Sequence, residues 1–184
     1  IHARELKEIK EVKSIPGCDA VYRRQALEKV MPIDESLLTC DDTELNQRLI
    51  DRGYKLLYTP DVFVWHYRRP NPKRLWKQMY RYAIGRLQGG KRDCRMINLM
   101  HILTGLALPI GLTILVFLPV LFWSMLILYT LLILSYAGAA LLKTNSIGVS
   151  LYVPLVISIM LCAWSLGFMR EVVFPIKKVS SASV

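Results

Sequence analysis

The order of hydrophobic and polar residues divides the chain into two parts that meet near residue 96. No charged side chain occurs from residue 97 to residue 142, and a second apolar run covers 147–169 after a polar break at 143–146. At about 1.5 Å of rise per helical residue, the first run is about twice as long as a ~30 Å hydrocarbon core requires. Pro119 divides this run. The pattern therefore predicts three membrane-spanning helices, over about 97–118, 120–142 and 147–169; two spans and a re-entrant hairpin are the alternative.

Residues 1–72 carry shorter, mixed patterns that predict an α/β arrangement. Helical spacing runs from Ala20 to Met31. A second helix is predicted after Thr39, because acidic residues fill its first turn, where the helix dipole favours them, and Gly53 follows its end. Two short strands are predicted over 54–59 and 62–67, with Pro60-Asp61 between them.

Residues 73–95 predict a basic amphipathic helix and a linker between the two parts. The helical spacing collects Trp76, Tyr80, Ala83, Ile84 and Leu87 on one side and Arg74, Lys77, Gln78 and Arg81 on the other. An apolar face with aromatic residues, opposite a cationic face and next to a membrane span, is typical of a helix in the membrane interface. The alternative is an ordinary surface helix that packs on the preceding domain.

The charges fall almost entirely before the apolar part. Of the 24 Lys and Arg residues, 20 lie within residues 1–96, and ten of these lie between residues 66 and 95 beside a single acid, Asp93. The positive-inside rule places this cluster in the cytosol, where anionic lipid head groups are the expected partner and nucleic acid is not. Three spans would put Arg170, Lys177 and Lys178 on the opposite side, which the same rule disfavours.

The four cysteines and the start of the chain add two expectations. Cys18, Cys40, Cys94 and Cys162 have no Cys-x-x-Cys spacing, so neither a zinc site nor a disulfide framework is predicted, which suits a reducing cytosolic face. The chain begins at Ile1 with no signal-peptide pattern. We therefore expect it to be the later part of a longer protein.

Several short motifs follow one another in a recognisable order over about 50 residues. They are Gly17-Cys-Asp-Ala-Val-Tyr-Arg-Arg, Ile33-Asp-Glu, Asp41-Asp-Thr-Glu-Leu, Arg48-Leu, Gly53-Tyr, Tyr58-Thr-Pro and Val64-Trp-His. Together with the basic helix and the spans, they resemble the C-terminal half of family 2 glycosyltransferases, which are inverting, nucleotide-sugar-dependent enzymes of the GT-A fold. The resemblance is close over roughly residues 14–95. It is greatest for the membrane-anchored members that build lipid-linked glycans and exopolysaccharides.

The resemblance implies a fold class and an arrangement of domains. Residues 1–72 would be the C-terminal part of a GT-A-like α/β catalytic domain, residues 73–95 an interface helix, and residues 96–184 an all-α transmembrane region. The nucleotide-binding half, with its Asp-x-Asp metal motif, would lie upstream. No Asp-x-Asp occurs here, so this chain alone is expected to be inactive.

The resemblance also implies roles for individual residues. Asp41 and Asp42 match the acidic pair at the start of a helix below the acceptor site, with Asp42 as the general base for the acceptor hydroxyl; the alternative is that they only cap the helix. Gly17, Cys18 and Asp19 match an acceptor-side loop, although a plain turn would explain Gly17 almost as well.

Two further sites follow from the same resemblance. His66 matches a ligand of Mg²⁺ or Mn²⁺ on the nucleotide diphosphate, and a strand-end His bonded to backbone is the alternative. Gln78, Arg81 and Tyr82 resemble the Gln-x-x-Arg-Trp motif of processive synthases, with Tyr in place of Trp. They would offer a guanidinium to phosphate and a ring to a sugar, unless Arg81 binds lipid head groups instead.

The predicted function is inverting transfer of a sugar from a nucleotide-sugar donor to a lipid-linked or polysaccharide acceptor. The enzyme would be an integral membrane protein with its catalytic part in the cytosol. The alternative is a non-catalytic membrane anchor or interaction module that associates with a glycosyltransferase. A transporter or pore is disfavoured because the apolar part offers few ionisable residues, chiefly His101 and Lys143.

Overall fold

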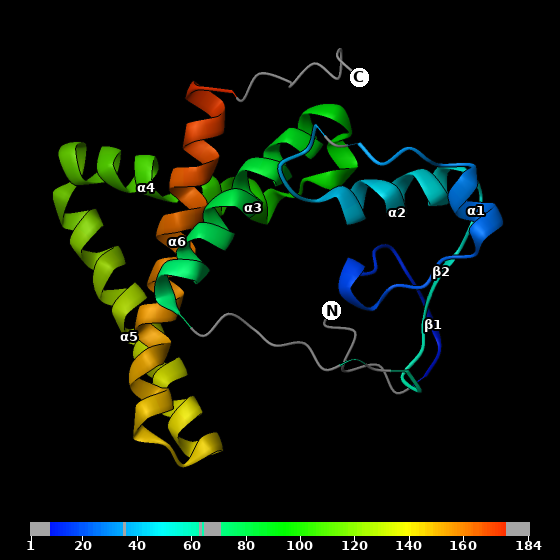
Figure 1. Cartoon of the computed structure of the whole chain (residues 1–184). Coiled ribbons are helices and arrows are strands. Elements are labelled where there is room, and N and C mark those ends of the chain that lie inside the picture. Colours follow the sequence, from blue (N-terminus) through cyan, green and yellow to red (C-terminus); the bar gives the residue numbers. More distant parts are fainter. Residues whose placement is uncertain (1–7, 35, 63, 65–70, 176–184) are drawn as a thin grey trace.

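The computed structural model of the chain describes residues 8–34, 36–62, 64 and 71–175. The described part is mostly helical, with three long apolar helices and one small two-stranded sheet (Figure 1). The sheet and two short helices form a polar unit. A long amphipathic helix lies between that unit and the apolar helices (Figure 1).

The polar unit is built around a small apolar core. Strand β1 (Lys10–Val12) pairs antiparallel with β2 (Leu56–Tyr58), and between them come the 3-10 helix η2 (Gly17–Asp19), α1 (Arg24–Glu28) and α2 (Asp41–Asp51). The buried core residues are Ala26, Val30, Leu45, Leu49 and Leu56. Helix α2 contributes two of these side chains, and α1 and β2 contribute one each, so these elements depend on one another for burial.

Two predictions for this unit need correction. The helix expected over residues 20–31 is reduced to the five residues of α1, because Arg23 is extended and only Ala26 in α1 is buried. The strand expected over 54–59 exists as the three residues of β2, and it pairs with β1, a strand in the charged start of the chain that was not predicted. Most of the strand predicted over 62–67 lies outside the described residues, and neither Val62 nor Val64 is in a strand.

Helix α2 agrees with the prediction at both ends. Its first turn holds Asp41, Asp42 and Glu44. Gly53 has φ of +80°, the left-handed conformation that glycine adopts without steric cost just after a helix. Cys40, directly before the helix, also has a positive φ of 71°.

Helix α3 (Pro72–Arg92) is the amphipathic helix, and its apolar face packs within the chain. It begins with Pro72 after Asn71, whose side chain accepts a hydrogen bond from Lys73 N–H at 2.8 Å. Ala83 and Ile84 are buried, and α3 crosses α6 (Ile147–Val173) closely (Figure 1). The centre of the apolar face therefore contacts protein.

One backbone contact and one ion pair join α3 to α6. A Cβ atom on Gly167 would overlap the carbonyl oxygen of Tyr80 and lie 3.0 Å from its Cα. Near the end of both helices, Lys91 Nζ lies 3.2 Å from an oxygen of Glu171, whose side chain is 2% exposed. A charge buried this deeply is costly without a partner, so this pair fixes the ends of α3 and α6 together.

The three apolar helices lie where the pattern predicted them. They are α4 (Leu99–Phe117), α5 (Pro119–Thr144) and α6, each with a mean hydropathy of 2.1 and long enough to cross a membrane. Helices α5 and α6 form an antiparallel hairpin, while α4 runs across α6 near its C-terminal end (Figure 1). Their number agrees with the three predicted spans.

A polar contact holds α4 against α6. Pro109 in α4 has no N–H to donate to the carbonyl of Gly105. The Ser165 hydroxyl, fully buried on α6, donates to that carbonyl at 2.8 Å and accepts from Leu108 N–H at 3.2 Å. The backbone groups that proline disturbs are thus satisfied inside the apolar region, as a lipid environment demands.

The contact at Gly167 yields a stability prediction. Gly167→Ala should push α3 away from α6 and lower the free energy of unfolding by about 1–3 kcal/mol. Gly138→Ala is the matched control, because a Cβ on Gly138 meets nothing within 4 Å. Thermal unfolding in detergent, followed by tryptophan fluorescence, measures both. Equal stability of the two variants would show that α3 and α6 are not in backbone contact.

Candidate active site

The acidic start of α2 lies at the surface of the polar unit. Asp41 is exposed and Asp42 is half-buried. Oδ2 of Asp42 accepts a hydrogen bond from the backbone N–H of Gly17 at 3.2 Å, and Oδ1 accepts one from Thr43 N–H at 2.7 Å. Two backbone donors therefore fix the orientation of this carboxylate while part of it stays accessible.

The predicted acceptor-side residues form η2, but only one of them contacts Asp42. Gly17, Cys18 and Asp19 are all exposed, and Gly17 donates the bond just described. The Cys18 sulfur lies 3.9 Å from an oxygen of Asp19, so these two side chains contact each other. The structure thus brings Gly17 to Asp42 and leaves the other two at the surface of the loop.

A buried asparagine on α2 holds this loop in place. Asn46 is fully buried, and its amide nitrogen donates to the carbonyl of Ile15 at 2.8 Å and to the Ser14 hydroxyl at 3.3 Å. Its amide oxygen accepts from the Tyr22 hydroxyl at 2.9 Å. Burial, and secondly the negative charge of Asp42, raise the pKa of Tyr22, so this hydroxyl remains a donor at neutral pH.

A cavity of about 700 Å³ adjoins the same loop. Its lining includes Pro16 and Asp19, and also Tyr58 and Thr59 at the end of β2. Asp42 does not line it. A volume in this range suits a small ligand. One loop therefore borders the cavity with Pro16 and Asp19 and binds Asp42 through Gly17.

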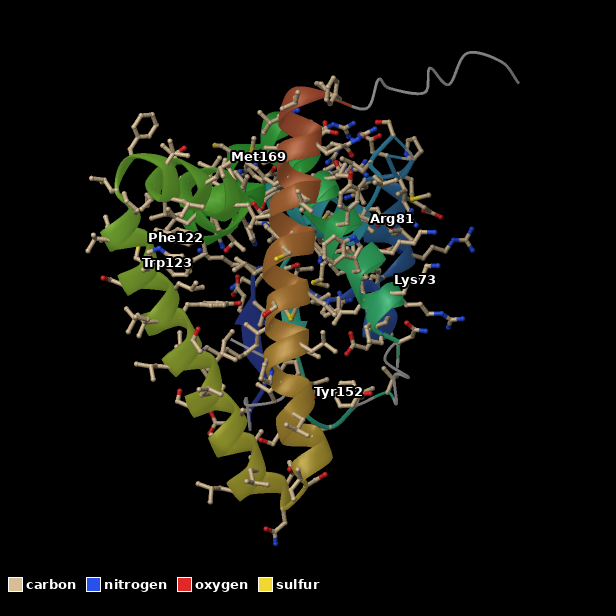
Figure 2. All side chains as sticks on the ribbon, turned by 90° about the vertical axis from the view of Figure 1, so that its left-hand side faces the viewer. Lys73, Arg81, Phe122, Trp123, Tyr152 and Met169 are labelled. Carbon is tan, nitrogen blue, oxygen red and sulfur yellow. The ribbon has the colours of Figure 1, made fainter. Side chains whose placement is uncertain are left out.

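The predicted site residues on α3 lie on its exposed side. Gln78 Nε2 donates to the Tyr82 hydroxyl at 2.9 Å, one turn apart, and Tyr82 is 41% exposed. Arg81 is exposed, and Figure 2 shows its side chain and that of Lys73 pointing away from α6. The guanidinium and the aromatic ring are thus available to a ligand.

The segment before α2 contacts α3 directly. The Thr39 hydroxyl donates to the carbonyl of Arg81 at 3.2 Å. Thr39 precedes Asp41 by two residues, so the turn of α3 that carries Arg81 contacts the chain just before the acids. Burial raises the pKa of the neighbouring Cys40 thiol. A buried neutral thiol is a poor nucleophile, which makes Cys40 a packing residue here.

The described residues do not form a metal site by themselves. In 8–34, 36–62, 64 and 71–175, no group of three or more His, Cys, Asp or Glu side chains could hold a metal ion. His66, the predicted ligand, lies outside the described residues. The predicted metal therefore has no complete set of ligands in this part of the chain.

Sequence reasoning missed the residues that position the site. These are Asn46 and its partner Tyr22, together with Thr39 and Gly85, whose backbones are in close contact. Asn46 lies between the apolar positions Leu45 and Leu49, where an amide needs buried partners. A small-residue spacing on α3, Gly85 and Gly89, also indicates close packing. Their partners are far away in the sequence, so no local pattern identifies them.

Comparison with known families gives one broad match. The model described as "Glycosyl transferase family group 2" matches residues 3–166 of the chain. This range includes the polar unit, α3, and most of the apolar helices. The match thus covers the described site and its membrane part together.

Similarity to individual proteins is more limited. The chain is 32% identical over 75 residues to "Probable glycosyltransferase YdaM" of Bacillus subtilis (strain 168). That alignment covers 41% of this chain and 18% of the relative, so the chain spans less than a fifth of the curated relative's length. No solved structure matches the chain significantly.

The hydrogen bonds of Asn46 lead to a prediction about the loop. Asn46→Ala should lower the free energy of unfolding by about 2–4 kcal/mol, because the partly buried Tyr22 hydroxyl and Ile15 carbonyl lose their partner. Gln47→Ala is the control, since Gln47 bonds only to the exposed Asp51 among the described contacts. Urea unfolding measures the difference, and equal losses would contradict the anchoring role of Asn46.

Proposed function

The chain belongs to glycosyl transferase family group 2, and from this premise we propose that it is the acceptor-side and membrane-anchoring part of an inverting glycosyltransferase. The donor is a nucleotide sugar, and the acceptor is a lipid-linked or polysaccharide hydroxyl. The polar unit is the C-terminal part of a GT-A-like domain. The whole enzyme, rather than this chain alone, carries the activity.

The observation that carries this proposal is the fixed orientation and partial exposure of the Asp42 side chain. A general base must be fixed in orientation and reachable by the proton that it accepts. The Asp42 carboxylate meets both conditions, because Gly17 N–H and Thr43 N–H hold it while it stays half-exposed. Asp41 is beside it and exposed, so a second acceptor of hydrogen bonds is available for the substrate.

The reaction is a single displacement at the anomeric carbon. As an acceptor oxygen attacks this carbon, Asp42 takes the proton of the hydroxyl. The bond to the nucleoside diphosphate breaks, and the diphosphate leaves with the bonding electrons. The new glycosidic bond forms on the opposite face, which inverts the configuration.

The acceptor contacts come from two places near Asp42. The loop of Gly17, Cys18 and Asp19 offers polar groups to a sugar, and Asp19 lines the cavity of about 700 Å³. Helix α3 offers the exposed Arg81 guanidinium to phosphate and the Tyr82 ring to a sugar face. The Thr39 hydroxyl bonds to the Arg81 carbonyl and so joins α3 to the segment that precedes Asp41 and Asp42.

The membrane position follows from the apolar helices and the basic cluster. Three helices can cross a bilayer. Basic residues that precede the first of them favour the cytosolic face and anionic head groups. On α3 the exposed cations include Lys73, Arg74, Lys77 and Arg81 in its first three turns, and the helix contains no acidic residue. A lipid-linked acceptor would present its hydroxyl at this surface.

The donor diphosphate would be neutralised by Mg²⁺ or Mn²⁺, with His66 as one ligand and the main ligands upstream. A divalent metal supplies charge stabilisation to the leaving diphosphate. The described residues act on the acceptor side, and none of the steps assigned to them requires the metal.

The base assignment is tested with Asp42→Asn in the full-length protein in native membranes. Amide in place of carboxylate removes the proton acceptor, so sugar transfer should fall about 10²- to 10⁴-fold. The assay measures release of nucleoside diphosphate from a panel of nucleotide sugars and labelling of the lipid fraction. Glu28→Gln is the control, because Glu28 is an exposed acid of α1 that pairs with the exposed Arg24 one turn away.

Two outcomes would contradict the proposal. Transfer by Asp42→Asn at the wild-type rate would remove Asp42 as the base. A wild-type protein that transfers no sugar from any donor of the panel would favour a non-catalytic membrane module.

The α3 surface is tested with Arg81→Gln. Loss of one charge-assisted contact should lower kcat/KM for the acceptor by about tenfold, mainly through a higher KM. Arg74→Gln, an exposed cation in the first turn of the same helix, should change KM much less. Equal effects of the two substitutions would mean that α3 contributes only its overall charge.

A further inference from the structure

Helix α3 is touched by backbone on two sides, and at both places the contact depends on a glycine. On one side Gly167 of α6 meets the backbone of Tyr80. On the other side Gly85 of α3 meets the backbone of Thr39, two residues before Asp41. At these two points α6 packs on α3, and α3 packs on the segment before α2, with no side chain between the backbones.

The contact at Gly85 is close enough to exclude any other residue. A Cβ atom there would clash with the Thr39 hydroxyl and lie 2.7 Å from the Thr39 carbonyl oxygen and 3.0 Å from its carbon. Backbone atoms cannot rotate away as a flexible side chain can. Any side chain at position 85 must therefore displace the 39–40 segment from α3.

Hydrogen bonds attach the same segment to α3 on both sides of Gly85. The Thr39 hydroxyl donates to the carbonyl of Arg81 at 3.2 Å, and Leu38 N–H donates to Gln88 Oε1 at 3.1 Å. Further along, Arg92 pairs with Asp34, and its guanidinium also donates to the Ser36 hydroxyl. Bonds from Ser36, together with the charge of Arg92, lower the pKa of Asp34, so this attachment is ionic at neutral pH.

The chain turns sharply between this attachment and the acids. Cys40 has a φ of 71°, a left-handed conformation that non-glycine residues rarely adopt, and α2 begins at the next residue. Such a conformation persists when its surroundings impose it. Here the surroundings are Thr39 fixed on α3 and Asp42 fixed by Gly17, with Cys40 between them.

We propose that α3 is a positioning element for the catalytic carboxylate. Gly85 and Thr39 are the positioning residues, and they hold Asp42 at a fixed position relative to α6. This inference rests on the proposed function for its catalytic consequence. Asp42 itself touches the substrate. Gly85 and Thr39 act only through it, by setting where α2 begins.

The central experiment compares Gly85→Ala with Gly89→Ala in the full-length protein. Both add one methyl group to a buried glycine of α3, but a Cβ on Gly89 meets first the flexible end of Met96, at 2.7 Å from Cε. In Gly85→Ala the amides of residues 37–45 should exchange hydrogen about fivefold faster than in Gly89→Ala. The kcat of sugar transfer should fall about tenfold or more, with donor KM within about twofold of wild type.

A second pair tests the same contact without added volume. Thr39→Val removes the hydroxyl that donates to Arg81, and Thr39→Ser retains it. Thr39→Val should lower kcat about threefold to tenfold at unchanged donor KM. Thr39→Ser should restore kcat to within about twofold of wild type.

The outcomes separate this inference from the proposed function. If Gly85→Ala matches Gly89→Ala in exchange or in kcat, or if Thr39→Val equals Thr39→Ser, the positioning role is wrong. Loss of transfer in Asp42→Asn would still support the base in that case. If Asp42→Asn is fully active, the base is wrong, and faster exchange in Gly85→Ala then shows a contact with no catalytic consequence.

Discussion

At Gly167 the backbones of α3 and α6 approach so closely that no side chain fits between them, and at Gly85 the backbone of Thr39 approaches α3 in the same way. Contacts of this kind have little freedom, because backbone cannot change rotamer to relieve a clash. The polar unit is therefore attached to the apolar helices through α3. The cluster of acids at the start of α2 takes its position from this arrangement.

The polar groups at the junction are arranged so that few of them are buried without a partner. Ser165 satisfies the carbonyl that Pro109 leaves without a donor, and Lys91 pairs with the deeply buried Glu171. Arg95 binds Asp51 with two bonds of 2.8 Å, and bonds from Arg95, then from Gln47, lower the pKa of Asp51. These bonds connect α4 to α6, α3 to α6, and α2 to the 3-10 helix η3 (Cys94–Met96) that follows α3.

The sequence predicts those features that depend on local pattern. The three apolar helices follow from their length and lack of charge, α2 from its acidic first turn and Gly53, and the family from ordered motifs that the family match confirms. The β1–β2 pairing was missed, because the three residues of β1 are too few to show alternation. The Thr39–Gly85 contact joins residues far apart in sequence, which no local pattern records. The roles of Asp42 and Arg81 stay predictions.

The central claim is that α2 has one fixed position relative to the membrane helices. Double electron–electron resonance tests it most directly, with spin labels at the exposed positions Arg52, just after α2, and Val173, at the end of α6. The full-length protein in lipid nanodiscs should give a single narrow distance distribution. A broad distribution, or one with several maxima, would contradict a base held rigidly above the bilayer.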